Sequence, residues 1–329
     1  MMKPTLKTMI GIALAGALLL TGAMVFAARK RPRASGPLGA AKPAAVEALR
    51  RDVAALCAIE ERNTLVPENL AHAAKLIEGE LSSAGYEVER QTYDVSRDAV
   101  RADNLIVELR GTSRPEEIVV IGAHYDCVPG TVGADDNATG VAALLALARR
   151  FADAKPARTL RFVAFVNEEP PHFQSRDMGS WQYAKRCRDR REKIVAMVSL
   201  ETIGYYDDAR GSQQYPAPLA ALYPDTGNFI GFASNVGSRA LLSRCIKAFR
   251  AATPFPAEST AMPEAIPGIG WSDQWSFWQF GWSAIMVTDT APFRNPHYHR
   301  PSDRPGTLDY ERLAHVVDGL GGVVSDLIR

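Results

Sequence analysis

The sequence predicts a three-layer α/β/α sandwich around a mostly parallel or mixed central sheet. Apolar runs at Ile118–Ala123, Thr159–Val166 and Ile194–Leu200 are typical of strands that are buried on both faces. Between the first two runs, Thr139–Phe151 carries apolar residues at helical spacing. Strands that alternate with helices in this way favour an α/β sandwich.

The remaining elements follow from the same patterns. A helix over Pro67–Ala84 begins at a proline and ends just before Gly85, which are the usual start and stop signals. Similar patterns predict two further helices, Arg239–Ala251 and Tyr310–Ile328, and three strands, Glu87–Tyr93, Asn104–Glu108 and Ala284–Thr288.

Composition is that of an ordinary globular protein, long enough for one large domain or two small ones. Of 329 residues, 47% are hydrophobic and 23% are charged, and the net charge of +1 gives no reason to expect a nucleic-acid partner. The scattered cysteines suggest neither a disulfide framework nor a thiolate zinc site, although one remote bridge stays open: Cys57, Cys127, Cys187 and Cys245.

The N-terminus differs from the rest of the chain. An uncharged stretch, Met9–Ala28, follows Lys3 and Lys7 and is long enough to cross a bilayer as a helix. Residues 1–28 are therefore predicted to be a membrane anchor or a signal peptide, with the folded domain exported to the periplasm or the cell exterior. Secretion after signal cleavage is the alternative. A linker is expected over residues 29–45, and one domain over residues 46–329.

Polar residues follow the three buried strands at the point where each ends. His124, Glu168 with Glu169, and Glu201 occupy these positions. Ligands of α/β folds bind beyond the carboxyl ends of the central strands, so these side chains are expected to meet at one edge of the sheet.

The segment His124-Tyr125-Asp126 can aim an imidazole at a metal ion while Asp126 takes the other ring N–H. An ordinary hydrogen-bonded pair is the simpler interpretation. In the turn that follows, capping of the next helix explains one of the polar residues at 135–137 but does not need both aspartates. Asp135 is the better candidate to bridge two metal ions, which leaves Asp136 or Asn137 for the cap.

The adjacent pair Glu168-Glu169 repels unless a cation lies near it, although a solvated loop would also tolerate it. One carboxylate can then bind metal while the other moves a proton. Glu201 ends an apolar strand and needs a partner. Of the late histidines His297 and His299, one is expected to be a ligand and the other a surface residue.

Together these motifs resemble metallopeptidase family twenty-eight, which includes bacterial two-zinc aminopeptidases, glutamate carboxypeptidase and glutaminyl cyclase. The motifs are His-x-Asp, Gly-Ala-Asp-Asp, Glu-Glu, Leu-Glu-Thr-Ile-Gly and Tyr-His-x-x-x-Asp, and the resemblance runs from about Glu68 to the C-terminus. It implies a zinc-exopeptidase fold and two Zn²⁺ ions.

The resemblance also implies a role for each motif residue. His124 and Glu201 would bind the first zinc, Asp135 would bridge, and Glu169 and His299 would bind the second. Glu168 would be the general base and Asp126 would orient His124.

Several features depart from the family pattern or remain ambiguous. Many members have Asp in place of Glu201, and His172 after Pro170-Pro171 could approach the substrate or be a plain loop residue. Cys127 is taken as a small buried residue. The clustered tryptophans belong either to the core or to a substrate pocket: Trp271, Trp275, Trp278 and Trp282.

The predicted function is a zinc-dependent exopeptidase acting on peptides, most simply an aminopeptidase that uses a metal-bridged water and Glu168 as base. Nitrogen and oxygen ligands also fit cobalt or manganese. Three alternatives stay open. These are a glutaminyl-cyclase-like acyltransferase with one zinc, a carboxypeptidase that uses Arg294 or Arg300, and a non-catalytic receptor domain.

Overall fold

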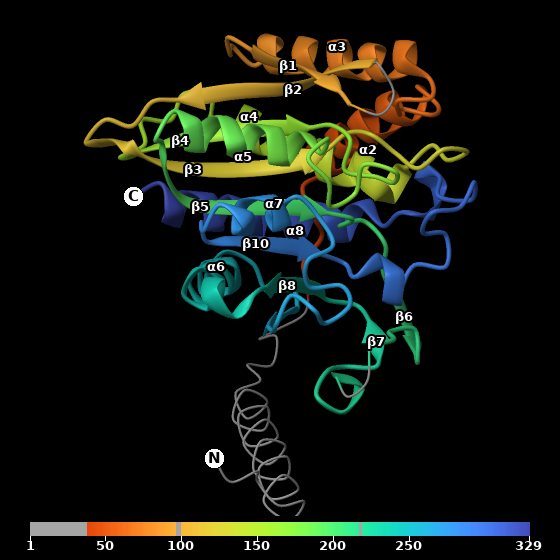
Figure 1. Ribbon diagram of the computed structural model, residues 1–329. Coiled ribbons are helices and arrows are strands. Elements are labelled where there is room, and N and C mark those ends of the chain that lie inside the picture. The colour runs from red at the N-terminus through yellow and green to blue at the C-terminus, as the bar shows by residue number, and fades with distance from the viewer. Residues whose placement is uncertain (1–37, 97–99, 217–218) are drawn as a thin grey trace, which may run out of the picture.

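A computed structural model describes residues 38–96, 100–216 and 219–329. Its centre is an eight-stranded mixed sheet in the order β1-β2-β4-β3-β5-β10-β8-β9 (Figure 1). The strands are β1 Glu89–Val95, β2 Val100–Leu109, β3 Arg114–His124, β4 Arg158–Phe165, β5 Lys193–Glu201, β8 Ile230–Ser234, β9 Ala257–Ala261 and β10 Ala284–Thr288.

Four adjacent strands, β4, β3, β5 and β10, run parallel. Antiparallel pairs join β1 to β2, β2 to β4, and β10 to β8, while β8 and β9 pair in parallel. The sheet is therefore mixed, with a parallel centre, as the sequence predicts. A separate two-stranded sheet, β6 Asp207–Arg210 with β7 Thr226–Gly227, lies in the connection after β5.

Helices cover both faces of the sheet. The larger hydrophobic core joins one face to α2 Pro43–Cys57, α3 Pro67–Ser83, α4 Gly140–Phe151, α6 Arg239–Ala252 and α8 Tyr310–Leu327. On the other face, a smaller core contains residues of α5 Gly179–Asp189 and α7 Gln274–Gln279. This is the predicted three-layer sandwich.

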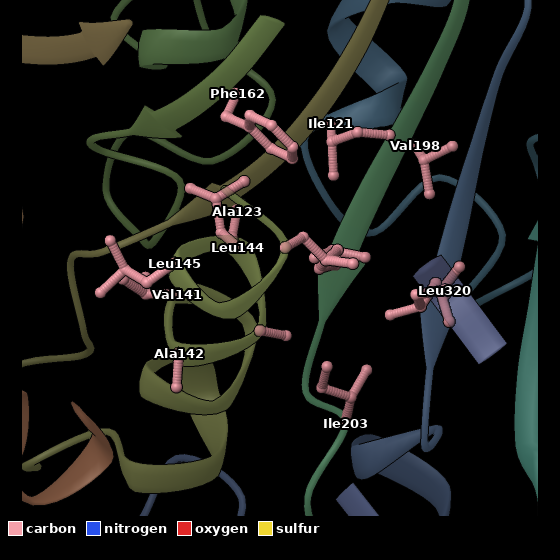
Figure 2. Close-up of a cluster of buried hydrophobic side chains, with 14 of the residues drawn as sticks. Ile121, Ala123, Val141, Ala142, Leu144, Leu145, Phe162, Val198, Ile203 and Leu320 are labelled. Carbon is pink, nitrogen blue, oxygen red and sulfur yellow. The ribbon is translucent and has the colours of Figure 1, made fainter. Parts of the chain in front are cut away.

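Helix α4 packs centrally because its apolar residues recur at helical spacing. Val141, Leu144 and Leu145 belong to the same buried cluster as Ile121 and Ala123 of β3 (Figure 2). These residues are at most 3% exposed, so α4 is fixed against the strands whose ends carry the polar motifs.

The described chain corrects the expected linker boundary. Helix α2 begins at Pro43, so residues 43–45 belong to the folded domain. Ala41 is buried, and its N–H donates to Glu311 Oε2 at 3.1 Å. The anchor or signal predicted for residues 1–28 lies outside the described residues. Within 38–96, 100–216 and 219–329, no helix combines the length and the apolar character of a membrane span.

Candidate metal centre

The ends of β3, β4 and β5 bring three of the predicted motifs to one edge of the sheet. His124 is the last residue of β3, Glu201 is the last residue of β5, and Glu168 with Glu169 follows β4. Because the three strands are neighbours and run parallel, their carboxyl ends lie side by side. The predicted convergence of these side chains is confirmed.

Two groups of potential ligands share one carboxylate. His124, Asp136 and Glu201 form the first group, and Asp136, Glu169 and His299 form the second. His124 Nε2 lies 3.3 Å from Asp136 Oδ1 and 3.2 Å from Glu201 Oε2. His299 Nε2 lies 3.1 Å from Asp136 Oδ2 and 3.4 Å from Glu169 Oε2. The two oxygens of Asp136 thus face different groups.

The bridging role predicted for Asp135 is wrong: its neighbour Asp136 is the residue that belongs to both ligand groups. Its carboxylate turns away from both groups: Oδ1 accepts from the Gly204 N–H at 2.9 Å, and Oδ2 accepts from Asn295 Nδ2 at 2.7 Å. Burial raises the pKa of Asp135 well above its usual range, as do the nearby charges of Asp289 and Asp303. Asp136 belongs to both ligand groups instead.

Hydrogen bonds to the side chains of Asn137 and Asp303 hold this turn in place. Asn137, one of the two predicted capping candidates, accepts from the Gly140 N–H at 3.1 Å and the Thr202 N–H at 3.0 Å through Oδ1. Asp303 accepts from the backbone N–H groups of Asp135 and Asp136, at 2.9 and 3.2 Å. The aspartate that ends the Tyr-His-x-x-x-Asp motif therefore positions Asp136.

Asp126 connects the histidine to the glutamate pair. Its Oδ1 lies 3.4 Å from His124 Nδ1 and accepts from the Glu168 N–H at 3.2 Å, while Oδ2 accepts from the Glu169 N–H at 3.1 Å. One carboxylate thus contacts both motifs.

Glu168 belongs to neither ligand group but lies beside them. Its Oε2 is 4.0 Å from His124 Nε2, and the side chain is buried. Burial raises the pKa of Glu168 well above its usual range against the effect of His124, and Glu201 and Glu169 raise it further. Burial, followed by the charge of Asp136, also raises the pKa of Glu169 to about 8.

The ligand groups fit metal ions better than a hydrogen-bonded cluster. Their four nitrogen–oxygen pairs are 3.1–3.4 Å apart, close to the edge of about 3.3 Å of a tetrahedron with metal–ligand bonds of about 2.0 Å. His124 Nε2, Asp136 Oδ1 and Glu169 Oε1 are buried without a hydrogen-bond partner. Such atoms are costly unless a cation satisfies them.

Sequence reasoning missed several residues around the site. Arg62 is fully buried, and its guanidinium donates to five backbone carbonyls, on Leu56, Ile59, Tyr125, Val132 and Gly133. Ser272 Oγ donates to Glu201 Oε2 at 2.7 Å. The pKa of the buried Asp273 is raised to about 7 by burial. Arg62 lies in a segment that mixes polar and apolar residues, and nothing in that pattern indicates that its charged side chain is buried.

The structure shows the surroundings of the histidines, cysteines and tryptophans whose roles the sequence left open. His297 stays outside the ligand groups, with Nδ1 3.0 Å from Ser302 Oγ, and His172 is buried with Nε2 3.1 Å from Thr64 Oγ1. All four cysteines are free and buried. Trp278 belongs to the core, whereas Trp271 is 40% exposed at the rim of a cavity described below.

Comparison with known proteins agrees with this geometry. The model of peptidase family M28 matches residues 104–324. The chain belongs to peptidase family M28. This is the metallopeptidase family that its motifs resemble, so the expected family and the hydrolase class are confirmed.

The similar proteins include an uncharacterized protein, an aminopeptidase and a glutaminyl cyclase. The uncharacterized protein YfbL of Escherichia coli is 37% identical over 262 residues, which cover 77% of this chain and 79% of YfbL. An aminopeptidase from Aneurinibacillus has a TM-score of 0.65 at 18% identity, covering 86% of this chain and 94% of that one. A glutaminyl cyclase from Bacteroides thetaiotaomicron has the same TM-score at 15% identity, covering 88% and 99%. At these identities, the likeness to the two solved structures shows a shared fold.

Proposed function

We propose that the chain is a zinc-dependent aminopeptidase with two zinc ions per chain. The observation that carries this proposal is Asp136, whose two oxygens face two separate groups of buried nitrogen and oxygen ligands. Imidazole and carboxylate ligands suit zinc. His124 and Glu201 would hold one ion, Glu169 and His299 the other, and Asp136 both.

Glu168 is proposed as the general base and acid. When bound, the metal ions would lower the pKa of a water molecule and polarise the scissile carbonyl. The carboxylate of Glu168 lies next to the ligands without being one of them, so it is available to take a proton from water and return it to the leaving nitrogen. Asp126 supports this role because it fixes the backbone of Glu168 and Glu169 together.

The charge around the site favours recognition of a free amine over a carboxylate. A cavity opens beside Glu201 and Tyr298, and among the described residues that line it there is no lysine, arginine or histidine. Arg294, one of the two cations considered for a carboxypeptidase, is buried and donates to Gln213 Oε1 at 2.7 Å and to the Phe229 carbonyl at 2.8 Å. Inside this cavity, an acidic C-terminus would lack a cationic partner among the described residues.

Substitution of Glu168 tests the chemical role. We expect Glu168→Gln to keep its zinc and to lose about 10²–10⁴-fold in kcat, which is the usual contribution of a general base. Bound zinc is measured by mass spectrometry on the same sample. Near-native turnover by this variant would refute the assignment.

Bound zinc and product chemistry test the reaction. The chain from Ala34 onward is assayed with free-amine peptides, with their N-acetyl forms and with a peptide that begins with glutamine. About two zinc ions per chain and cleavage of free-amine peptides alone would support the proposal. One zinc ion with cyclisation of N-terminal glutamine would instead identify an acyltransferase.

A further inference from the structure

The loop that carries Glu168 and Glu169 is closed at its base. It follows β4 and runs from Val166 to Gly179, where α5 begins. The Gly179 N–H donates to the Val166 carbonyl at 2.7 Å, and the N–H groups of the two glutamates donate to Asp126. The direction of the Glu168 side chain therefore depends on the short stretch of backbone between Val166 and Glu168.

Asn167 is the one residue between these two, and its backbone is in an uncommon conformation. Its φ of +61° lies in the left-handed region, which asparagine enters more readily than most residues with a side chain, but still at a cost. The side chain of Asn167 is buried. Because Glu168 follows directly, a change in this dihedral angle would redirect the Glu168 carboxylate.

A contact from β1, at the edge of the sheet, holds Asn167. Its Nδ2 donates to the Tyr93 hydroxyl at 3.1 Å, and this hydroxyl donates to the Asp177 carbonyl at 2.9 Å. Burial raises the pKa of Tyr93 well above its usual range, so the hydroxyl keeps the proton that it donates. Tyr93 thus connects the start of the loop, just before Glu168, with its end, just before α5.

Strand β2 supports the same loop. Asn104 Oδ1 accepts from the Val166 N–H at 3.2 Å, and Asn104 Nδ2 donates to the Gly179 carbonyl at 2.8 Å. Beside it, the Tyr125 hydroxyl donates to the Asp103 carbonyl at 2.7 Å. The antiparallel pair of β1 and β2 therefore contacts the segments that follow both β3 and β4.

A second residue next to β1 fixes the far end of this arrangement. Asp177 Oδ1 accepts from the Ser96 N–H at 3.2 Å and from Ser96 Oγ at 2.8 Å. Both Tyr93 and Ser96 precede residues 104–324, which the model of family M28 matches, so that match assigns no role to β1.

We propose that Tyr93 is a positioning residue for catalysis, which acts through Asn167 to hold the turn that aims the Glu168 carboxylate at the metal centre. The inference rests on the proposed role of Glu168 as general base. A displacement of about 1 Å at a reacting group can cost about 10²-fold in rate, so a hydroxyl group away from the reacting atoms can have a large effect.

The first experiment removes the hydroxyl and keeps the ring. In zinc-loaded Tyr93→Phe, we expect kcat on free-amine peptides to fall about 10- to 100-fold while KM changes less than about threefold, because the base moves and the substrate contacts stay. Bound zinc should stay at the native amount, since neither Tyr93 nor Glu168 is a ligand. A native kcat, or a loss of zinc in proportion to the loss of activity, would overturn the proposal.

Tyr86→Phe is the matched control. The Tyr86 hydroxyl also donates to a backbone carbonyl, that of Ala148, at 2.8 Å. Ala148 lies eight residues beyond the start of α4, about 12 Å along the helix from the turn of Asp136. Tyr86→Phe should therefore lose stability in urea as Tyr93→Phe does, but keep its kcat. An equal loss of kcat in both variants would reduce Tyr93 to a general structural role.

A double-mutant cycle tests the path through Asn167. Asn167→Gly removes the amide but permits the left-handed backbone. If Tyr93 acts through Asn167, adding Tyr93→Phe to Asn167→Gly should lower kcat by less than about threefold, because the contact is already lost. Losses that multiply independently would contradict the proposed path.

Hydrogen exchange separates failure of this inference from failure of the proposed function. In the segment 166–179 of the zinc-loaded chain, we expect the Glu168 and Glu169 amides to exchange about tenfold faster in Tyr93→Phe, and at the native rate in Tyr86→Phe. This difference in a chain that hydrolyses no peptide would support the hold of Tyr93 on the loop and refute the aminopeptidase. Equal exchange in the native chain and Tyr93→Phe would overturn the proposal whatever the turnover.

Discussion

His297 and His299 differ by two positions but lie in different surroundings. His299 Nε2 approaches Asp136 and Glu169, whereas His297 belongs to neither ligand group. We expect His299→Asn to lose about one zinc ion per chain and at least 100-fold in activity, because the second group then keeps only its carboxylates. His297→Asn is the matched control and should keep both. Zinc content and peptide turnover check this prediction, and equal zinc loss in the two variants would contradict it.

Arg62 is expected to position the metal centre through backbone alone. Its guanidinium joins the end of α2 to the segment after His124 and to the turn before Asp136. Arg62→Met would leave several buried carbonyls without donors, at a cost of about 1–3 kcal/mol each.

We therefore expect Arg62→Met to lower the free energy of unfolding by several kcal/mol and to weaken zinc binding. Arg62→Lys should recover only part, since a lysine lacks the planar fork of donors. Urea unfolding and a zinc titration measure the two effects, with the exposed Arg101→Met as control. Native zinc affinity in a folded Arg62→Met chain would limit the residue to a structural role.

Residue types were predictable from the sequence, but the direction of each side chain was not. His124, Glu168, Glu169, Glu201 and His299 could be selected because each follows a buried strand or completes a motif. The choice between Asp135 and Asp136 depends on backbone dihedrals inside the turn, where Asp136 is non-helical with φ −109° and ψ 90°. Adjacent aspartates carry no sequence signal for that difference.

At the scale of elements, the sequence predicted the helices and strands whose apolar residues recur with a strong period. β10 coincides with its prediction, and α8 ends one residue before the expected position. β8 and β9 have only five residues each and contain small or polar side chains, so they lacked a strand pattern. Helix α2 was partly assigned to a linker because its sequence begins in an alanine-rich region.

A charged cluster lies near the amino ends of β3, β4 and β5, and its contribution to stability should depend on pH. Glu117 on β3 lies 2.6 Å from Arg158 Nε on β4 and 2.9 Å from Lys193 Nζ on β5. These two partners lower the pKa of Glu117 to about 2. A pKa that is lower in the folded state stabilises the fold above the unfolded value of about 4.3, and this contribution is lost as the pH falls toward about 2.

We expect Glu117→Gln to unfold more easily than the native chain at pH 7, with a difference that shrinks between about pH 4.5 and pH 2. Glu116→Gln, at the exposed neighbouring position, is the control. Urea unfolding at pH 7 and at pH 3 measures both variants. A difference that grows in acid would show that the cluster does not act through the Glu117 charge.

At the scale of the whole molecule, the metal centre joins parts of the chain that are far apart in sequence. It connects the ends of three parallel strands with Asp136, which precedes α4, and with His299, which precedes α8. The membrane anchor or signal peptide expected over residues 1–28 stays a prediction, and fractionation of cells that express the full chain or the chain from Ala34 checks it.

Zinc removal should lower the stability of this whole assembly. Without a cation, the buried carboxylates of Asp136, Glu169 and Glu201 lie close together with no positive metal ion between them. Burial and, after it, the charge of Asp136 raise the pKa of Glu169 to about 8. A ligand that binds only the folded state stabilises it by about 4 kcal/mol at a thousandfold excess over Kd. We expect chelation to lower Tm by several degrees, and added zinc to restore it.

The matched histidine variants decide whether this stabilisation comes from the proposed centre. His297→Asn should respond to chelator and zinc as the native chain does, whereas His299→Asn should respond less, because one ligand group is incomplete. Scanning calorimetry with and without chelator measures the response. A Tm that is independent of zinc in the native chain would mean that the buried ligands are satisfied by protons alone, and the two-zinc assignment would then fall with it.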